Sequence, residues 1–166
     1  GIYLDGAVSA PRIMDCNLDG NLSLSTGTGV LIENGVMNPL ITGVYAFGHN
    51  EDCIIIDSCI NPIVSGCTFM NNNLAENGST DITLKKTFSQ DLENPLIQGN
   101  AFTQTAILAG TAGAAVTLAA GATRSGVRII DNSIHQPGVG GGYTDVEINL
   151  VDGYFTSGMQ AVSYTH

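Results

Sequence analysis

A short alternation of apolar and polar residues recurs six times along the chain. Each copy has aliphatic residues at its first and third positions: IYLD at 2–5, VLIE at 30–33, IIID at 54–57, ITLK at 82–85, VTLA at 116–119 and VEIN at 146–149. A period of two is typical of a half-buried β-strand. The copies begin 24 to 34 residues apart, with a mean of about 29. The pattern therefore predicts one β-strand repeated along the whole chain.

Alignment of the six copies gives two columns that are aliphatic throughout. The first column holds Ile2, Val30, Ile54, Ile82, Val116 and Val146. The second holds Leu4, Ile32, Ile56, Leu84, Leu118 and Ile148. Because side chains two residues apart share one face of a strand, we expect both columns to line one core.

A second motif lies between successive copies. It reads NPLITG at 38–43, NPIVSG at 61–66 and NPLIQG at 94–99, and PRIMDC at 11–16 and VRIIDN at 127–132 align with it. Proline fixes φ where the second strand starts, an aliphatic residue two positions later faces the core, and Gly or Asp relaxes the bend. In the next column we expect Asn100 and Asn132 to stack inside the fold, with amides that hydrogen-bond from rung to rung.

Each repeat is thus a strand, a turn, a second strand and a variable return, which would hold a third strand at 21–25 and 106–110. Unequal spacing is expected where insertions fall in turns while the strands keep register. We predict an all-β fold, a right-handed parallel β-helix of about five to six coils that stack about 4.8 Å apart. A β-sandwich would not align columns at this period, and the leucine-rich repeat consensus is absent.

Composition narrows the functional classes. With 12% charged residues and 21 glycines in 166 residues, a helical bundle is disfavoured. The net charge of −10 argues against binding to nucleic acid or to an anionic membrane surface, and no apolar run is long enough to span a membrane. The four cysteines lack metal-site spacing, so we expect reduced, buried thiols. The chain begins in a strand-like stretch without Met or a visible signal peptide, and we expect it to be part of a longer protein.

The coil length, the Asn-Pro corners and the Gly- and Asn-rich turns resemble the pectate-lyase-like right-handed β-helix. Within that superfamily the chain most resembles the shaft of bacteriophage tailspikes and tail fibres, over nearly its whole length. The resemblance implies a homotrimer in the virion tail, assembled in the bacterial cytoplasm, that binds bacterial surface polysaccharide and in many cases cleaves it. It extends to the coil pattern and to no catalytic motif. A non-catalytic shaft, or an extracellular adhesin, is the alternative.

The last part of the chain departs from the repeat. We expect β-helix coils over residues 1–153 and a cap or assembly segment over residues 154–166, where Tyr154, Phe155 and Tyr164 gather.

The position after each first-strand triplet carries the candidate chemistry. It holds Asp5, Glu33, Asp57, Lys85, Ala119 and Asn149, which the alternation places outward on one face. Carboxylates on neighbouring rungs would lie about 5 Å apart and those two rungs apart about 10 Å, and glycosidases use acid pairs in this range of separations. We predict Asp5, Glu33 and Asp57 as catalytic residues, with Lys85 and Tyr3 binding substrate.

Other interpretations of this column stay open. Stacked oxygen ligands would also suit calcium, and a solvated polar face would carry no activity at all. A lyase is less favoured, because it needs basic groups and the chain has five Lys and Arg residues in total. We predict no metal and no cofactor. Two classes remain: a polysaccharide-binding and depolymerising protein, or a structural shaft.

Overall fold

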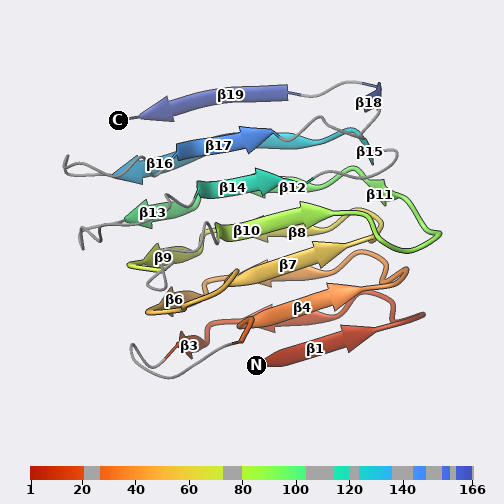
Figure 1. Ribbon diagram of the computed structural model, residues 1–166, viewed down its shortest axis with the longest axis horizontal. Coiled ribbons are helices and arrows are strands. Elements are labelled where there is room, and N and C mark those ends of the chain that lie inside the picture. Colours follow the sequence, from red (N-terminus) through yellow and green to blue (C-terminus); the bar gives the residue numbers. More distant parts are fainter. Residues whose placement is uncertain are drawn as a thin grey trace.

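The computed structural model describes residues 1–20, 27–72, 80–103, 114–119, 124–135, 144–148, 155–157 and 160–165. Within these ranges the chain forms strands and turns and no helix. Successive coils stack on one another from the first strand, β1, to the last, β19 (Figure 1). Every strand pair is parallel, as predicted for a β-helix. The third strands expected at 21–25 and 106–110 lie outside the described residues.

The first sheet confirms the repeated strand. It stacks, in order, β1 (Ile2–Asp5), β4 (Val30–Glu33), β7 (Ile54–Asp57), β10 (Thr80–Lys85), β14 (Ala114–Leu118) and β17 (Thr144–Ile148). The register pairs both predicted aliphatic columns position by position, from Ile2 with Val30 to Leu118 with Ile148.

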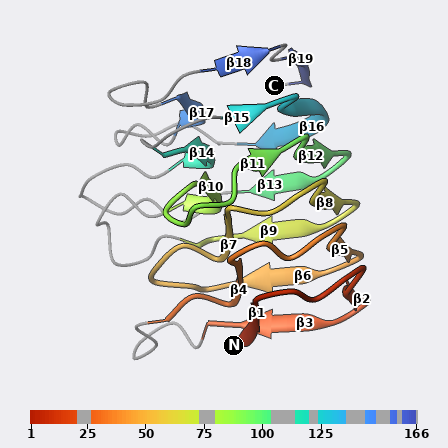
Figure 2. The same ribbon diagram turned by 90° about the vertical axis from the view of Figure 1, so that its right-hand side faces the viewer.

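The NP motif forms the second side of the coil, and the chain after it forms the third (Figure 2). The second side stacks β2 (Arg12–Met14), β5 (Leu40–Thr42), β8 (Ile63–Ser65), β12 (Leu96–Gln98) and the first half of β16 (Arg128–His135). The third stacks β3 (Asn17–Asp19), β6 (Tyr45–Phe47), β9 (Thr68–Met70), β13 (Ala101–Thr103) and the second half of β16. Three short strands form a separate small sheet: β11 (Leu92–Glu93), β15 (Arg124–Ser125) and β18 (Phe155–Ser157).

The aliphatic columns meet inside the coil. Ile32, Ile56 and Leu84 on the first sheet are fully buried. Phe69 and Phe102 stack face to face beneath the third side, with ring centroids 4.9 Å apart. Burial of such side chains stabilises a fold by about 1.5–3 kcal/mol each. The continuous column, rather than any single contact, therefore holds the coils together.

Left-handed residues make the coil corners. As expected, the Gly or Asp after the NP strand takes positive φ, from 49° at Asp15 to 63° at Gly43 and Gly99. The asparagine before each proline also takes positive φ: 51° at Asn38 and 50° at Asn61 and Asn94. Asn tolerates this conformation better than other non-glycine residues. The NP motif is thus a corner whose bend begins at the asparagine, one residue before the proline.

The predicted internal asparagine stack is confirmed. Asn100 is 1% and Asn132 2% exposed, and the Nδ2 of Asn100 donates to the Oδ1 of Asn132 at 3.0 Å. The side-chain oxygen of Asn100 accepts the backbone N–H of Cys67 at 2.9 Å, and its Nδ2 also donates to the carbonyl of Val64 at 3.1 Å. The stack therefore pairs amides along the coil axis and closes the corner of the coil next to it.

All four cysteines are free, and burial raises the pKa of Cys59 to about 12, which keeps that thiol protonated.

β18 and β19 (Gln160–Thr165) pair with β15 and β16, so these parts of residues 154–166 continue the ladders. Their role as a cap or assembly segment stays a prediction. Among the described residues, no helix is long and apolar enough to cross a membrane.

Candidate functional site

The predicted polar column forms in the predicted order. Asp5 pairs with Glu33, Glu33 with Asp57, and Asp57 with Lys85, each one rung from the next. Neighbouring rungs are about 4.8 Å apart. Exposure differs along the column: Asp5 is exposed, Glu33 and Lys85 are half-buried, and Asp57 is 0% exposed.

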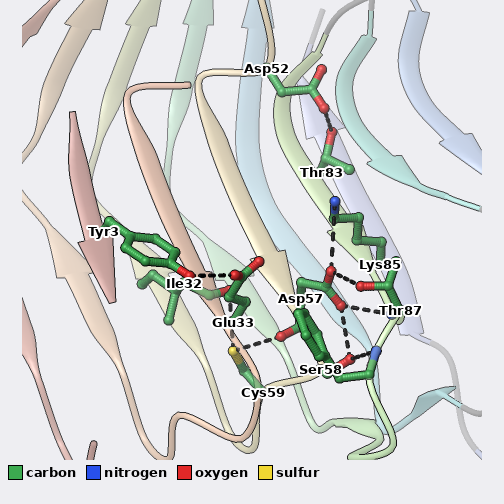
Figure 3. Close-up of polar contacts among 11 residues, drawn as sticks. Tyr3, Ile32, Glu33, Asp52, Asp57, Ser58, Cys59, Thr83, Lys85 and Thr87 are labelled. Carbon is green, nitrogen blue, oxygen red and sulfur yellow. Dashed lines mark hydrogen bonds and ion pairs between the residues drawn. The ribbon is translucent and has the colours of Figure 1, made fainter. Parts of the chain in front are cut away.

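The open end of the column holds the exposed Asp5 and the half-buried Glu33, and a tyrosine contacts the glutamate (Figure 3). The Tyr3 hydroxyl reaches the adjacent rung and donates to Oε1 of Glu33 at 2.7 Å. Tyr3 is 59% exposed, so its ring lies open to a ligand. The hydrogen bond to Glu33, with smaller contributions from desolvation and Asp5, raises the pKa of Tyr3 to about 12. The phenol therefore stays a neutral hydrogen-bond donor across the physiological pH range.

An amide holds the second carboxylate. Nδ2 of Asn34 donates to Oδ1 of Asp5 at 2.9 Å. Asn34 follows Glu33 directly and takes a φ of 60°, which turns the chain at the sheet edge. We call Tyr3, Asp5, Glu33 and Asn34 the edge cluster. It combines an aromatic ring, two acids on adjacent rungs and an amide, which are groups that bind sugar rings and hydroxyls.

The expectation that Asp57 points into solvent is wrong. Its carboxylate accepts the backbone N–H of Thr87 at 2.8 Å, the Thr87 hydroxyl, and the Ser58 hydroxyl at 2.8 Å (Figure 3). Nζ of Lys85 lies 3.6 Å from the same carboxylate. The alternation along the strand is as predicted, but a later part of the chain covers this position.

That covering segment is residues 86–91, which we call the strap. Besides the Thr87 contacts, the backbone N–H of Phe88 donates to the Ser58 hydroxyl at 3.1 Å. Lys86 and Asp91, at the two ends of the strap, form an ion pair at 2.5 Å. Asp57 thus anchors the strap to the coil below. The aligned motifs contain no indication of this, because residues 86–91 lie outside them.

A further acidic anchor was missed in the sequence. Asp52 accepts the backbone N–H of Thr80 at 2.8 Å and the hydroxyl of Thr83 at 2.7 Å, and so links the start of one coil to β10 (Figure 3). The available signal was Thr83, the second residue of ITLK, since a hydroxyl on the outward side of a strand suits a carboxylate partner. Within the described ranges, no three His, Cys, Asp or Glu side chains lie close enough together to hold a metal ion.

Comparison with known proteins agrees with this architecture. Residues 1–154 match the family model described as a right handed beta helix region, so the chain belongs to that family. No curated protein and no solved structure matches it.

Proposed function

We propose that this β-helix recognises bacterial surface polysaccharide as part of a phage tailspike or tail fibre. The observation that carries the proposal is the edge cluster, where the exposed ring of Tyr3 adjoins carboxylates on two adjacent rungs. Aromatic rings stack on the apolar faces of sugars, carboxylates accept hydrogen bonds from sugar hydroxyls, and amides both accept and donate them. The net charge of −10 is compatible with such a ligand and unfavourable for nucleic acid.

The acid pair also supports hydrolysis as the accompanying reaction. Asp5 and Glu33 sit one rung apart, about 4.8 Å, close to the carboxyl separation of about 5–5.5 Å in retaining glycosidases. In this scheme Glu33, positioned by Tyr3, is the nucleophile and Asp5 the general acid. The strap encloses Asp57, which also contacts Lys85, so the catalytic pair of the proposal is Asp5 and Glu33.

Self-association into a homotrimer is part of the same proposal. On the second side of the coil, Leu40, Ile63 and Leu96 occupy one outward column on successive rungs and are half-buried in the single chain. Arg12 and Arg128 flank these three residues in the column and are exposed. An apolar stripe of this kind fits a contact between copies, and sizing in solution tests it. A stable monomer would contradict this part of the proposal.

The proposal is tested by incubating the chain with purified bacterial surface polysaccharides. Reducing ends report hydrolysis, and the absorbance of unsaturated sugar reports elimination. We expect Asp5→Asn and Glu33→Gln each to lower any hydrolysis by about 10²-fold or more, with binding retained. Asp15→Asn, which alters an exposed acid at another corner, is the matched control and should act as the unaltered chain does. Cleavage that survives both site variants would contradict the assignment of the acid pair.

A further inference from the structure

The outward face of the third side carries a compact group of large side chains. On each of these strands the middle residue is buried and its two neighbours face outward. On β6 the outward residues are Tyr45, 37% exposed, and Phe47, half-buried. On β9, the next rung, Met70 lies beside Phe47. We call Tyr45, Phe47 and Met70 the aromatic shelf.

The two rings of the shelf are close and tilted. The centroids of Tyr45 and Phe47 are 5.9 Å apart, with an interplanar angle of 39°. The Tyr45 hydroxyl lies 3.1 Å from the sulfur of Met70, which is one rung away and two residues further along. To reach that sulfur, the Tyr45 ring must lean diagonally across the neighbouring strand instead of standing upright from the sheet. One ring face is therefore turned outward, next to a second ring.

Small polar side chains surround the shelf. One rung below, Asn17 pairs with Tyr45 and Asp19 with Phe47. One rung above, Thr68 pairs with Tyr45, and beyond Met70 lies Thr103. None of the outward residues on β3, β6, β9 and β13 is a lysine or arginine: Asn17, Asp19, Tyr45, Phe47, Thr68, Met70, Ala101 and Thr103.

The rings of the shelf and the small polar side chains around it favour one class of ligand. An outward aromatic ring offers its π-face to C–H groups, and the amide, hydroxyl and carboxylate groups around the shelf match sugar hydroxyls. A uronate or other acidic sugar would find no cation on these strands and would face Asp19. An uncharged sugar, a hexose or an N-acetylated amino sugar, meets no such penalty.

We propose that the aromatic shelf is a second polysaccharide-binding surface, for uncharged sugar residues. The inference rests on the proposed function for the kind of ligand, but it concerns another face. The shelf lies on the third side of the coil, and the edge cluster lies on the first sheet (Figure 2). Two sites on one rigid scaffold engage a long polymer with higher avidity than either site alone.

The test is affinity electrophoresis in gels that contain O-antigen polysaccharides, one set uncharged and one set containing uronate. Tyr45→Thr removes the ring and keeps a residue suited to a strand. We expect it to weaken binding to the uncharged set by roughly tenfold. Tyr45→Phe, which keeps the ring, should bind as the unaltered chain does. Met14→Ala is the matched control, because Met14 is 48% exposed on the second side and its loss should change nothing.

The outcomes separate the two proposals. If Tyr45→Thr binds as tightly as the unaltered chain, or if the uronate set is preferred, the shelf is not a sugar site. If Tyr3→Ala then still weakens binding by roughly tenfold, the proposed function stands without the shelf. If the unaltered chain binds neither set, both proposals fall. Should Tyr45→Thr not fold, as judged by its thermal transition, Phe47→Leu tests the shelf by keeping apolar bulk without the ring, with the same roughly tenfold loss expected.

Discussion

Asparagine side chains stabilise this β-helix in two places, buried inside the coil and exposed along its outer edge. Inside, each buried asparagine accepts a backbone N–H and donates to a backbone carbonyl three residues earlier on the adjacent coil. Asn72 accepts the N–H of His49 and donates to the carbonyl of Ala46. Asn100 does the same with Cys67 and Val64, and Asn132 with Asn100 and Ile97. Each buried amide therefore closes a corner from within.

The outer set stacks in a different way. Asn94 donates to Asn61 at 3.0 Å and Asn61 to Asn38 at 2.9 Å, side chain to side chain along an exposed corner. Water can replace these bonds, whereas nothing replaces a buried one. The outer asparagines matter mainly because they take positive φ. The same residue thus stabilises the coil through hydrogen bonds inside and through backbone conformation outside.

The largest loss of stability is expected from replacing one of the buried asparagines. Asn100→Ala removes the partners of two buried backbone groups and of the Asn132 amide, so we expect the free energy of unfolding to fall by about 3 kcal/mol. Urea unfolding followed by circular dichroism measures it. Asn17→Ala, an exposed asparagine on β3, is the control and should change stability by less than about 0.5 kcal/mol. Equal losses for the two variants would contradict the role given to burial.

An intermediate effect is expected where an inner asparagine braces a titratable residue. His49 is 4% exposed, its backbone N–H is bound by Asn72, and its Nε2 lies 3.3 Å from the carbonyl of Leu18. Burial lowers the pKa of His49, opposed by weaker effects that include the charge of Asp19. The unfolded chain takes up a proton near pH 6.5, whereas the folded chain does so only at lower pH. Stability should therefore fall as the pH drops below that value, by at most about 1.4 kcal/mol per pH unit.

His49→Gln tests this dependence, because glutamine keeps a polar side chain that does not titrate. Thermal unfolding between pH 7 and pH 5 should show a shallower loss of stability for the variant. Asn17→Ala, at an exposed asparagine on β3 that carries no titratable group, should keep the slope of the unaltered chain. If His49→Gln leaves the slope unchanged, the buried imidazole is not its source.

The smallest effect is expected at the outer edge, and there the replacement decides its size. Asn61→Ala must hold a φ of 50° with a Cβ and no capping amide, so we expect a loss of about 1–2 kcal/mol. Asn61→Gly adopts this φ freely and loses only the exposed amide bonds, so its cost should be about half as large or less. Urea unfolding of both variants decides between the two roles. Equal costs for the two variants would show that the outer asparagines act through their hydrogen bonds, which both replacements remove.

The sequence predicted most where the repeat is regular. The two aliphatic columns, the parallel register and the Asn100–Asn132 stack all follow from residues that recur at aligned positions. Asn72 was missed because it lies in NNN at 71–73, outside the aligned motif. The aromatic shelf was missed because Ala46 was not recognised as the buried residue between Tyr45 and Phe47.

The sequence predicted the order of the acidic residues along the candidate site, but it did not predict which of them are buried. Alternation along a strand places Asp5, Glu33 and Asp57 on one column, and the register confirms it. It cannot tell which positions a later loop covers. Thr87, thirty residues after Asp57, binds that carboxylate. The strap was not predicted, because residues 86–91 do not belong to a repeated motif.

The central claim is that the outer face of this β-helix binds polysaccharide at the edge cluster. The most direct measurement is isothermal titration of the folded chain with size-fractionated O-antigen polysaccharide at pH 7, beside the Tyr3→Ala variant. The account predicts saturable binding that Tyr3→Ala weakens by roughly tenfold while its thermal transition stays unchanged. Equal binding by the two folded chains, or no binding by either, would contradict it.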